Sequence, residues 1–197
     1  MGSAFPILHD SNPPSPRETP LNEKTITKKT LYTGRILTLE TQDIEMANGQ
    51  KGMREIIRHR GAVAVLARLP DGRFALVRQF RKPVEREMLE VVAGNREPNE
   101  DSELCARREL REETGYKAKA VRRLGFINPS PGYCDEKIEI FFAEVDAESG
   151  QTDPDEDEHV EVVLMTREEI VRKISRDEIH DSKTLVAWLM FEKMVES

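Results

Sequence analysis

Alternating apolar and polar positions predict β-strands in the first patterned part of the sequence. Between residues 25 and 45, apolar side chains such as Ile26, Leu31 and Leu39 recur between polar ones, which is typical of half-buried strands. Asn48-Gly49 then supplies a two-residue hairpin signal, and residues 53–59 have strand character. We therefore expect residues 25–60 to form a small antiparallel β-lobe.

Short continuous apolar runs come next and predict buried strands. Residues 61–67 form such a run, and Pro70-Asp71-Gly72 turns the chain into a second strand at 74–80. A third short run covers 89–93. Strand patterns return at 120–127, 137–145 and 160–165.

Three segments have helical character. Residues 99–113 lack glycine and proline, with Asn99 as the expected N-cap and Gly115 as the expected left-handed C-terminal residue. Thr166 to Glu169 form a capping box that opens a short helix, and Asp181 precedes a last one. Strands, a helix, strands and two helices in this order predict an α+β fold, an α/β/α sandwich with a mixed sheet.

Composition narrows the class of protein. The 197 residues suit one domain with a small extra lobe, so we expect a mobile proline-rich arm (1–24), the β-lobe (25–60) and a main domain (61–197). No apolar stretch approaches the ~18 residues of a membrane span, and no signal peptide shows at the start. Two cysteines are too few for a disulfide framework, which favours the cytoplasm.

The acidic balance argues against nucleic acid as a partner. Acidic side chains number 37 against 30 basic ones, for a net charge of −7, whereas phosphate neutralisation needs a basic surface. An anionic small substrate remains compatible with this charge if a metal ion supplies the positive charge.

Three glutamates in one segment point to such a metal. Glu109, Glu112 and Glu113 stand at i, i+3 and i+4, so they share one face of a helix and repel one another. A hard divalent cation would relieve that repulsion, because Mg²⁺ prefers carboxylate oxygens. The alternative is an ordinary solvated helix whose glutamates pair with neighbouring arginines.

The spacing around these glutamates resembles the Nudix box, Gly-x5-Glu-x7-Arg-Glu-U-x-Glu-Glu-x-Gly-U, where U is a bulky apolar residue. Gly94 opens the match, every fixed position agrees, and Tyr116 occupies the last apolar place. The resemblance implies a Nudix hydrolase, which cleaves nucleoside diphosphates linked to another group with Mg²⁺ or Mn²⁺, and it implies the Nudix α/β/α sandwich from residue 61 onward.

The resemblance also implies roles for individual residues. Arg108 would orient the glutamates, and Glu100 would fasten the loop to the helix. Glu112 is implied to be both a metal ligand and a catalytic carboxylate. The implied metal ligands on and beside the box are the carbonyl of Ala93 and the side chains of Glu109, Glu112 and Glu113.

Residues outside the box resemble the ADP-ribose pyrophosphatase branch of the family. Pro131 stands sixteen residues after Gly115, inside a Ser-Pro-Gly-aromatic loop that ends at Glu136. Both Pro131 and Glu136 are thus implied to bind substrate, although a Ser-Pro-Gly segment is also an ordinary turn. Upstream, Glu90 matches a branch segment and is also implied to bind substrate. Arg81 is either a phosphate clamp or one half of a surface ion pair.

An acidic loop would supply the general base. The residues from 153 to 161 hold six acidic side chains and no lysine or arginine, a pattern that alone indicates a solvated loop. In the branch that it resembles, the equivalent loop carries a catalytic glutamate. Glu156 and Glu158 are both candidates, Glu158 also as a metal ligand, and Asp157 is a further option.

The β-lobe resembles the dimerisation lobe of the same branch. A homodimer is therefore expected, with the base of the substrate near Arg54 or Arg58. The implied activity is hydrolysis of a nucleoside diphosphate sugar, first of all ADP-ribose to AMP and ribose 5-phosphate. GDP-mannose and ADP-glucose are alternative substrates, and a non-catalytic ADP-ribose sensor is a different class of function that the intact box disfavours.

Overall fold

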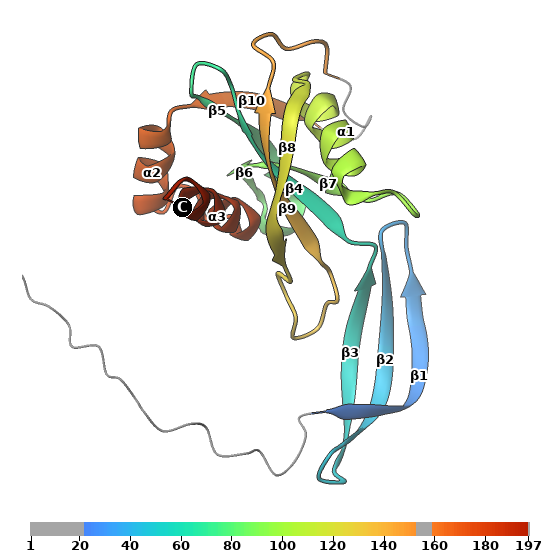
Figure 1. Cartoon of the computed structure of the whole chain (residues 1–197). Coiled ribbons are helices and arrows are strands. Elements are labelled where there is room, and N and C mark those ends of the chain that lie inside the picture. Colours follow the sequence, from blue (N-terminus) through green and yellow to red (C-terminus); the bar gives the residue numbers. More distant parts are fainter. Residues whose placement is uncertain (1–21, 153–158, 197) are drawn as a thin grey trace, which may run out of the picture.

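The computed structural model describes residues 22–152 and 159–196. Most of the predicted proline-rich arm and the acidic positions 153–158 lie outside this part of the chain. The first three strands, β1 (Glu23–Thr33), β2 (Leu37–Met46) and β3 (Lys51–His59), form an antiparallel sheet in the order β1-β2-β3. Figure 1 shows this sheet, the β-lobe, projecting away from the remaining elements.

The hairpin between β2 and β3 is confirmed, but its loop is longer than the two residues expected. The N–H of Gly49 donates to the carbonyl of Met46 at 2.8 Å, and the N–H of Met46 donates to the carbonyl of Gln50 at 2.8 Å. Within this loop, Gly49 is the only residue with a positive φ, +81°. A two-residue type I′ turn needs positive φ at both central positions, so the chain uses a longer connection with Gly49 in the left-handed position.

The second sheet is mixed, as predicted. Its main path runs β10-β5-β4-β9-β8, and β6 and β7 pair with β5 and β4. The pair β4 and β9 is parallel, whereas the other pairs are antiparallel. The strands are β4 (Ala62–Arg68), β5 (Phe74–Arg81), β6 (Arg86–Glu90), β7 (Val92–Asn95), β8 (Ala118–Ile127), β9 (Ile138–Val145) and β10 (Val160–Met165).

The single strand expected at 89–93 is wrong, because the chain changes partner at Val91. β6 continues along β5, whereas β7 pairs with β4. The strands β4 and β5 pair with each other at only two positions beside their turn, and they then diverge. β6 and β7 fill the opening between them, and the N–H of Val91 donates to Thr184 Oγ1 at 2.9 Å.

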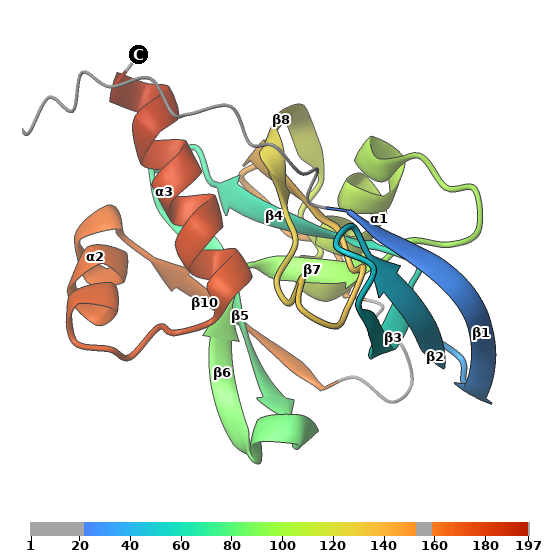
Figure 2. The same cartoon turned by 90° about the horizontal axis from the view of Figure 1, so that it is seen from below.

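Helices cover both faces of the mixed sheet, which confirms the sandwich. α1 (Ser102–Thr114) lies on one face, and α2 (Arg167–Ser175) and α3 (Ser182–Glu196) lie on the other (Figures 1 and 2). The two cores explain the continuous apolar run of β4. Ala64 and Leu66 join the α3 side with Trp188, whereas Val63 and Val65 join the α1 side.

The helix ends differ from expectation at one position. Asn99 does not cap α1; it has a φ of +65° in the preceding turn. Asp101 caps the helix instead, since its Oδ1 accepts from the N–H groups of Glu103 and Leu104 at 2.9 and 3.2 Å. Gly115 takes the predicted left-handed conformation with φ +72°. Among the described residues, no helix combines the length and apolarity needed to cross a membrane.

Candidate active site

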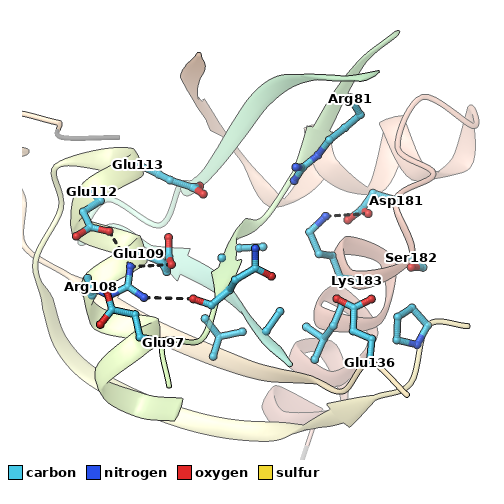
Figure 3. A pocket seen from close by; sticks show the side chains of 17 residues that line it. Arg81, Glu97, Arg108, Glu109, Glu112, Glu113, Glu136, Asp181, Ser182 and Lys183 are labelled. Atoms are coloured by element: carbon cyan, nitrogen blue, oxygen red, sulfur yellow. Dashed lines mark hydrogen bonds and ion pairs between the residues drawn. The ribbon is translucent and has the colours of Figure 1, made fainter. Parts of the chain in front are cut away.

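A cavity of about 450 Å³ lies where α1, β7, the loop before β9 and the start of α3 meet (Figure 3). One wall carries the carboxylates of α1, and the opposite wall carries two cations. α1 and the start of α3 are far apart in sequence. The charged lining residues are Arg81, Glu97, Arg108, Glu109, Glu112, Glu113, Glu136, Asp181 and Lys183.

The acidic wall is the helix face predicted from the spacing. Glu109 and Glu113 are buried, and Glu112 is half-buried. Arg108 Nη1 donates to Glu109 Oε1 at 2.8 Å and to Glu112 Oε2 at 2.9 Å (Figure 3). The positive charge of Arg108 offsets part of the repulsion between these carboxylates. The glutamates thus pair with a neighbouring arginine, as the alternative to a metal site predicted. Their carboxylates also face the cavity.

Glu100 fastens the preceding loop to α1 through the same arginine. Arg108 Nε and Nη2 donate to the two carboxylate oxygens of Glu100 at 2.9 and 3.0 Å, and the N–H of Glu97 donates to one of them at 2.9 Å. Hydrogen bonds from Arg108 are the main cause that lowers the pKa of Glu100 to about 2. Glu100 thus stays ionised and holds Arg108 in place beneath the acidic wall.

Replacing Glu100 by glutamine tests this fastening. A lowered pKa in the folded state means stabilisation that is complete above the ordinary pKa of 4.5 and lost as pH falls toward about 2. We expect Glu100→Gln to lower the free energy of unfolding by about 1–3 kcal/mol at pH 7. The difference from wild type should shrink at pH 3 when both are unfolded in urea.

Glu103→Gln is the matched control for that experiment, because Glu103 is an exposed residue of the same helix whose ion-pair partner within the described residues is Arg107. Its effect should stay within about 0.5 kcal/mol at both pH values. A Glu100→Gln effect that is small, or that is equal at pH 7 and pH 3, would contradict the fastening role.

Gly94 is required by the close approach of Glu109. A Cβ built on Gly94 would lie 1.9 Å from Glu109 Cδ and 2.1–2.2 Å from its carboxylate oxygens. Any side chain at this position of β7 therefore displaces the glutamate. The neighbouring residue, Ala93, also lines the cavity, so the first glycine of the box brings β7 and α1 together at the site.

The opposite wall holds Arg81 and Lys183 above a buried carboxylate. Arg81 donates to Glu90 through Nε at 2.8 Å and Nη2 at 2.7 Å. Lys183 Nζ donates to the same glutamate and, at 3.0 Å, to Asp181. Glu90 is 1% exposed and is not one of the lining residues. In this structure it contacts the two cations, and the cations face the cavity.

Lys183 and Asp181 belong to the site although the candidate residues did not include them. The only signal in the sequence was the Asp-Ser-Lys-Thr segment at the start of the last helix, which resembles the closing segment of the branch. Spacing cannot relate this segment to the box, because nothing in the sequence fixes which strand end α3 will face. The same holds for Pro129 and Glu97, which also line the cavity.

The Ser-Pro-Gly loop reaches the cavity through Glu136. His59 Nδ1 lies 3.6 Å from Glu136 Oε1, and β3 holds the loop by main-chain bonds of Ile57 to Tyr133 and Asp135. Pro131 is exposed and does not line the cavity. In this structure Pro131 lies in the turn of the loop, while Glu136 faces the site.

Arg54 and Arg58, which were expected near the base of the substrate, lie outside the cavity of the single chain. Arg54 pairs with Glu23 on β1, and Arg58 pairs with Glu40 and with Asp135. Neither lines the cavity. The base candidates Glu156 and Glu158, together with Asp157, fall outside the described residues.

The donor set of the acidic wall fits a hard divalent cation. Carboxylate oxygens and the Ala93 carbonyl are the ligands that Mg²⁺ and Mn²⁺ prefer. Among the described residues, no group of three histidine, cysteine, aspartate or glutamate side chains is arranged to hold a metal as it stands. Arg108 contacts one carboxylate oxygen of Glu109 and one of Glu112, and each of these carboxylates has a second oxygen that can serve as a metal ligand.

The fold and this wall of box residues define a class of protein. A family model described as the NUDIX domain matches residues 58–189, and the chain belongs to the Nudix hydrolase family. The hydrolases of this family generally need a divalent metal, in agreement with the donor set.

Individual relatives are similar over most of the chain. An ADP-ribose pyrophosphatase of Bacillus subtilis (strain 168) is 42% identical over 168 residues, covering 85% of this chain and 91% of the relative. A methanol dehydrogenase activator of Bacillus methanolicus is 40% identical over 166 residues, covering 84% and 90%. The crystal structure of an ADP compounds hydrolase superimposes with a TM-score of 0.77 over 88% of this chain and 94% of that chain. At 23% identity, this last likeness shows the fold alone.

Proposed function

We propose that this protein hydrolyses the diphosphate bond of nucleoside diphosphate sugars, and that ADP-ribose is its main substrate, giving AMP and ribose 5-phosphate. The observation that carries the proposal is the cavity in which the box carboxylates face Arg81 and Lys183. Such a site suits a group with negative charge at its centre. The resemblance to an ADP-ribose pyrophosphatase over most of the chain supports the choice of substrate.

The two walls of the cavity have different proposed roles, metal binding on one and phosphate binding on the other. Glu109, Glu112, Glu113 and the carbonyl of Ala93 would hold Mg²⁺ or Mn²⁺, which when bound neutralises phosphate charge and lowers the pKa of an attacking water. Arg81 presents its guanidinium to the phosphate oxygens, where bidentate contact is strong. Arg108 and Glu100 keep the glutamates in position.

The loops complete the proposed site. Glu136 is placed to contact the ribose hydroxyls or the diphosphate, and Pro131 shapes the loop that carries it. Glu156 or Glu158 is proposed as the base that accepts the proton of the attacking water, and Glu158 as a further metal ligand. Glu90 acts on the substrate through Arg81 and Lys183.

A panel of sugar nucleotides tests the proposed activity. ADP-ribose, ADP-glucose and GDP-mannose are incubated with Mg²⁺ or Mn²⁺ and an alkaline phosphatase, which releases phosphate only from the monophosphate products. We expect turnover of ADP-ribose that a chelator abolishes, with AMP then measured by separation from ADP-ribose, because a chelator also inactivates the phosphatase. Failure to split any sugar nucleotide would refute the proposal, and a faster reaction with GDP-mannose would change the substrate within the same chemistry. Tight ADP-ribose binding without turnover would support the sensor instead.

We further propose a homodimer that forms through the β-lobe. All eleven residues of β1 are exposed, and an uncovered edge of this kind needs a partner. Large apolar side chains are also exposed on the lobe, at Ile26, Leu31, Tyr32, Ile36 and Met53. Arg54 and Arg58 lie on the same lobe, so a dimer would bring them toward the substrate base.

Light scattering after gel filtration checks the dimer. Wild type is expected at twice the chain mass of 22.6 kDa, and Leu31→Asp is expected to shift it to monomer with a higher KM. Val171→Asp is the control, because Val171 is an exposed apolar residue on α2. A monomeric wild type would refute the dimer.

The free thiols of Cys105 and Cys134 support a location in the reducing cytoplasm.

A further inference from the structure

Lys183 is a buried lysine on the wall of the cavity. The residue is 9% exposed, yet it is among the lining residues, at the start of α3. Figure 3 shows it between Arg81 and Glu136, across the cavity from the α1 carboxylates. Lysine is almost never this buried unless it is paired, so the ammonium group of Lys183 needs anionic partners.

Glu90 is the partner that Lys183 shares with Arg81. The glutamate comes from the end of β6 and is 1% exposed. Burial alone would raise the pKa of Glu90, but the hydrogen bonds and charges of Arg81 and Lys183 hold it below its usual value. The carboxylate is therefore ionised, and one buried anion fixes two cations side by side.

The hydrogen-bond geometry of Lys183 leaves capacity for a ligand. A lysine ammonium has three N–H donors. Within the described residues, side-chain bonds to Glu90 and Asp181 account for two of them. The side chain of Asp181 also accepts from the N–H and the hydroxyl of Thr184 at 2.9 and 2.6 Å, so the first turn of α3 locks the carboxylate that holds the lysine.

The two walls are complementary to a diphosphate. Carboxylates suited to a divalent cation stand on one side, and Arg81 with Lys183 stands on the other. An anion bound between them would meet positive charge from both directions. A lysine that served only to neutralise Glu90 would gain nothing from a position on the cavity wall.

We propose that Lys183 binds phosphate oxygens of the substrate together with Arg81, and that Glu90 is the positioning residue that sets the spacing of the two cations. This deepens the proposed function and rests on it. The class of ligand is the phosphate group of a nucleotide or of a sugar phosphate. Lys183 is thus a substrate-binding residue supplied by the last helix.

Paired ligands with and without phosphate test the role of Lys183. Calorimetry with Mg²⁺ present compares AMP with adenosine, and ribose 5-phosphate with ribose, on wild type and Lys183→Met. We expect the variant to bind at least one phosphorylated ligand tenfold or more weakly, with its unphosphorylated partner unaffected. The KM for ADP-ribose should rise by a similar factor. Lys173→Met, on α2 and paired with Glu178, is the matched control and should change nothing.

Two outcomes would overturn the inference. One is unchanged affinity for both phosphorylated ligands, and the other is an equal loss for each phosphorylated ligand and its partner, which indicates structural damage. If Lys183→Met does not fold, Lys183→Gln makes the same comparison with a polar side chain. A wild type that hydrolyses no sugar nucleotide refutes the proposed function. An active wild type together with a Lys183→Met variant whose affinity for phosphorylated ligands is unchanged refutes only this inference.

Glu90→Gln tests the positioning role separately. The substitution keeps the size of the side chain and removes the charge that holds both cations. We expect the KM for ADP-ribose to rise tenfold or more with a smaller change in kcat, and the preference for a phosphorylated ligand over its unphosphorylated partner to fall for the same ligand pair as in Lys183→Met. A purely structural role would lower the unfolding temperature without changing that preference.

Discussion

Replacing Glu113 by glutamine is expected to lower kcat for ADP-ribose by about a thousandfold or more while the protein stays folded. Glu113 is 4% exposed and lines the cavity from α1. Glutamine has nearly the same volume, so the core around it can keep its packing. What disappears is the negative charge, and a neutral amide is a weak ligand for a hard divalent cation.

Metal binding provides a second readout for the same variant. Titration with Mn²⁺, followed by the relaxation of water protons, should show weaker binding in Glu113→Gln than in wild type. Glu103→Gln is the control, because Glu103 is an exposed residue of the same helix that does not line the cavity. A Glu113→Gln enzyme with full activity would remove this helix face from the mechanism.

The Gly94→Ala variant is expected to lower kcat/KM about a hundredfold or more, by misplacing Glu109. The added methyl group would occupy the space of the Glu109 carboxylate, 1.9 Å from its Cδ. The backbone of Gly94 is compatible with alanine, since its φ is not in the left-handed region. Strain of the main chain therefore does not explain a loss, which must come from the displaced carboxylate.

Gly132→Ala is a matched control for the glycine. A Cβ on Gly132 meets nothing within 4 Å, and its φ is also outside the left-handed region. This variant should retain wild-type activity and stability. If Gly94→Ala were as active as Gly132→Ala, the close approach of β7 and Glu109 would not matter for turnover.

Features that depend on neighbouring residues were predictable from the sequence. The i, i+3, i+4 spacing placed Glu109, Glu112 and Glu113 on one helix face because helical periodicity is a local property. The apolar run of β4 indicated a buried strand for the same reason. The Nudix family assignment, which rests on fixed residues over one loop and one helix, is confirmed.

Local signals failed where two competed within a few residues. Asn99 and Asp101 are both good N-caps, and the chain uses Asp101 because the preceding turn places Asn99 in the left-handed region. The Asn-Gly hairpin was found, but its loop type was not. The run 89–93 looked like one strand, since nothing in its composition says that the chain changes partner at Val91.

By itself, the sequence determined the box helix, its acidic face and the family, because each depends on residues close together along the chain. Only the tertiary structure decided what stands opposite that face. The contact of Glu90 with Lys183 spans 93 positions and exists because β6 and β7 fill the opening between β4 and β5. The sheet thereby carries Glu90 to the start of α3. Long-range packing of this kind depends on the whole core, so no local pattern could place Lys183 beside Arg81.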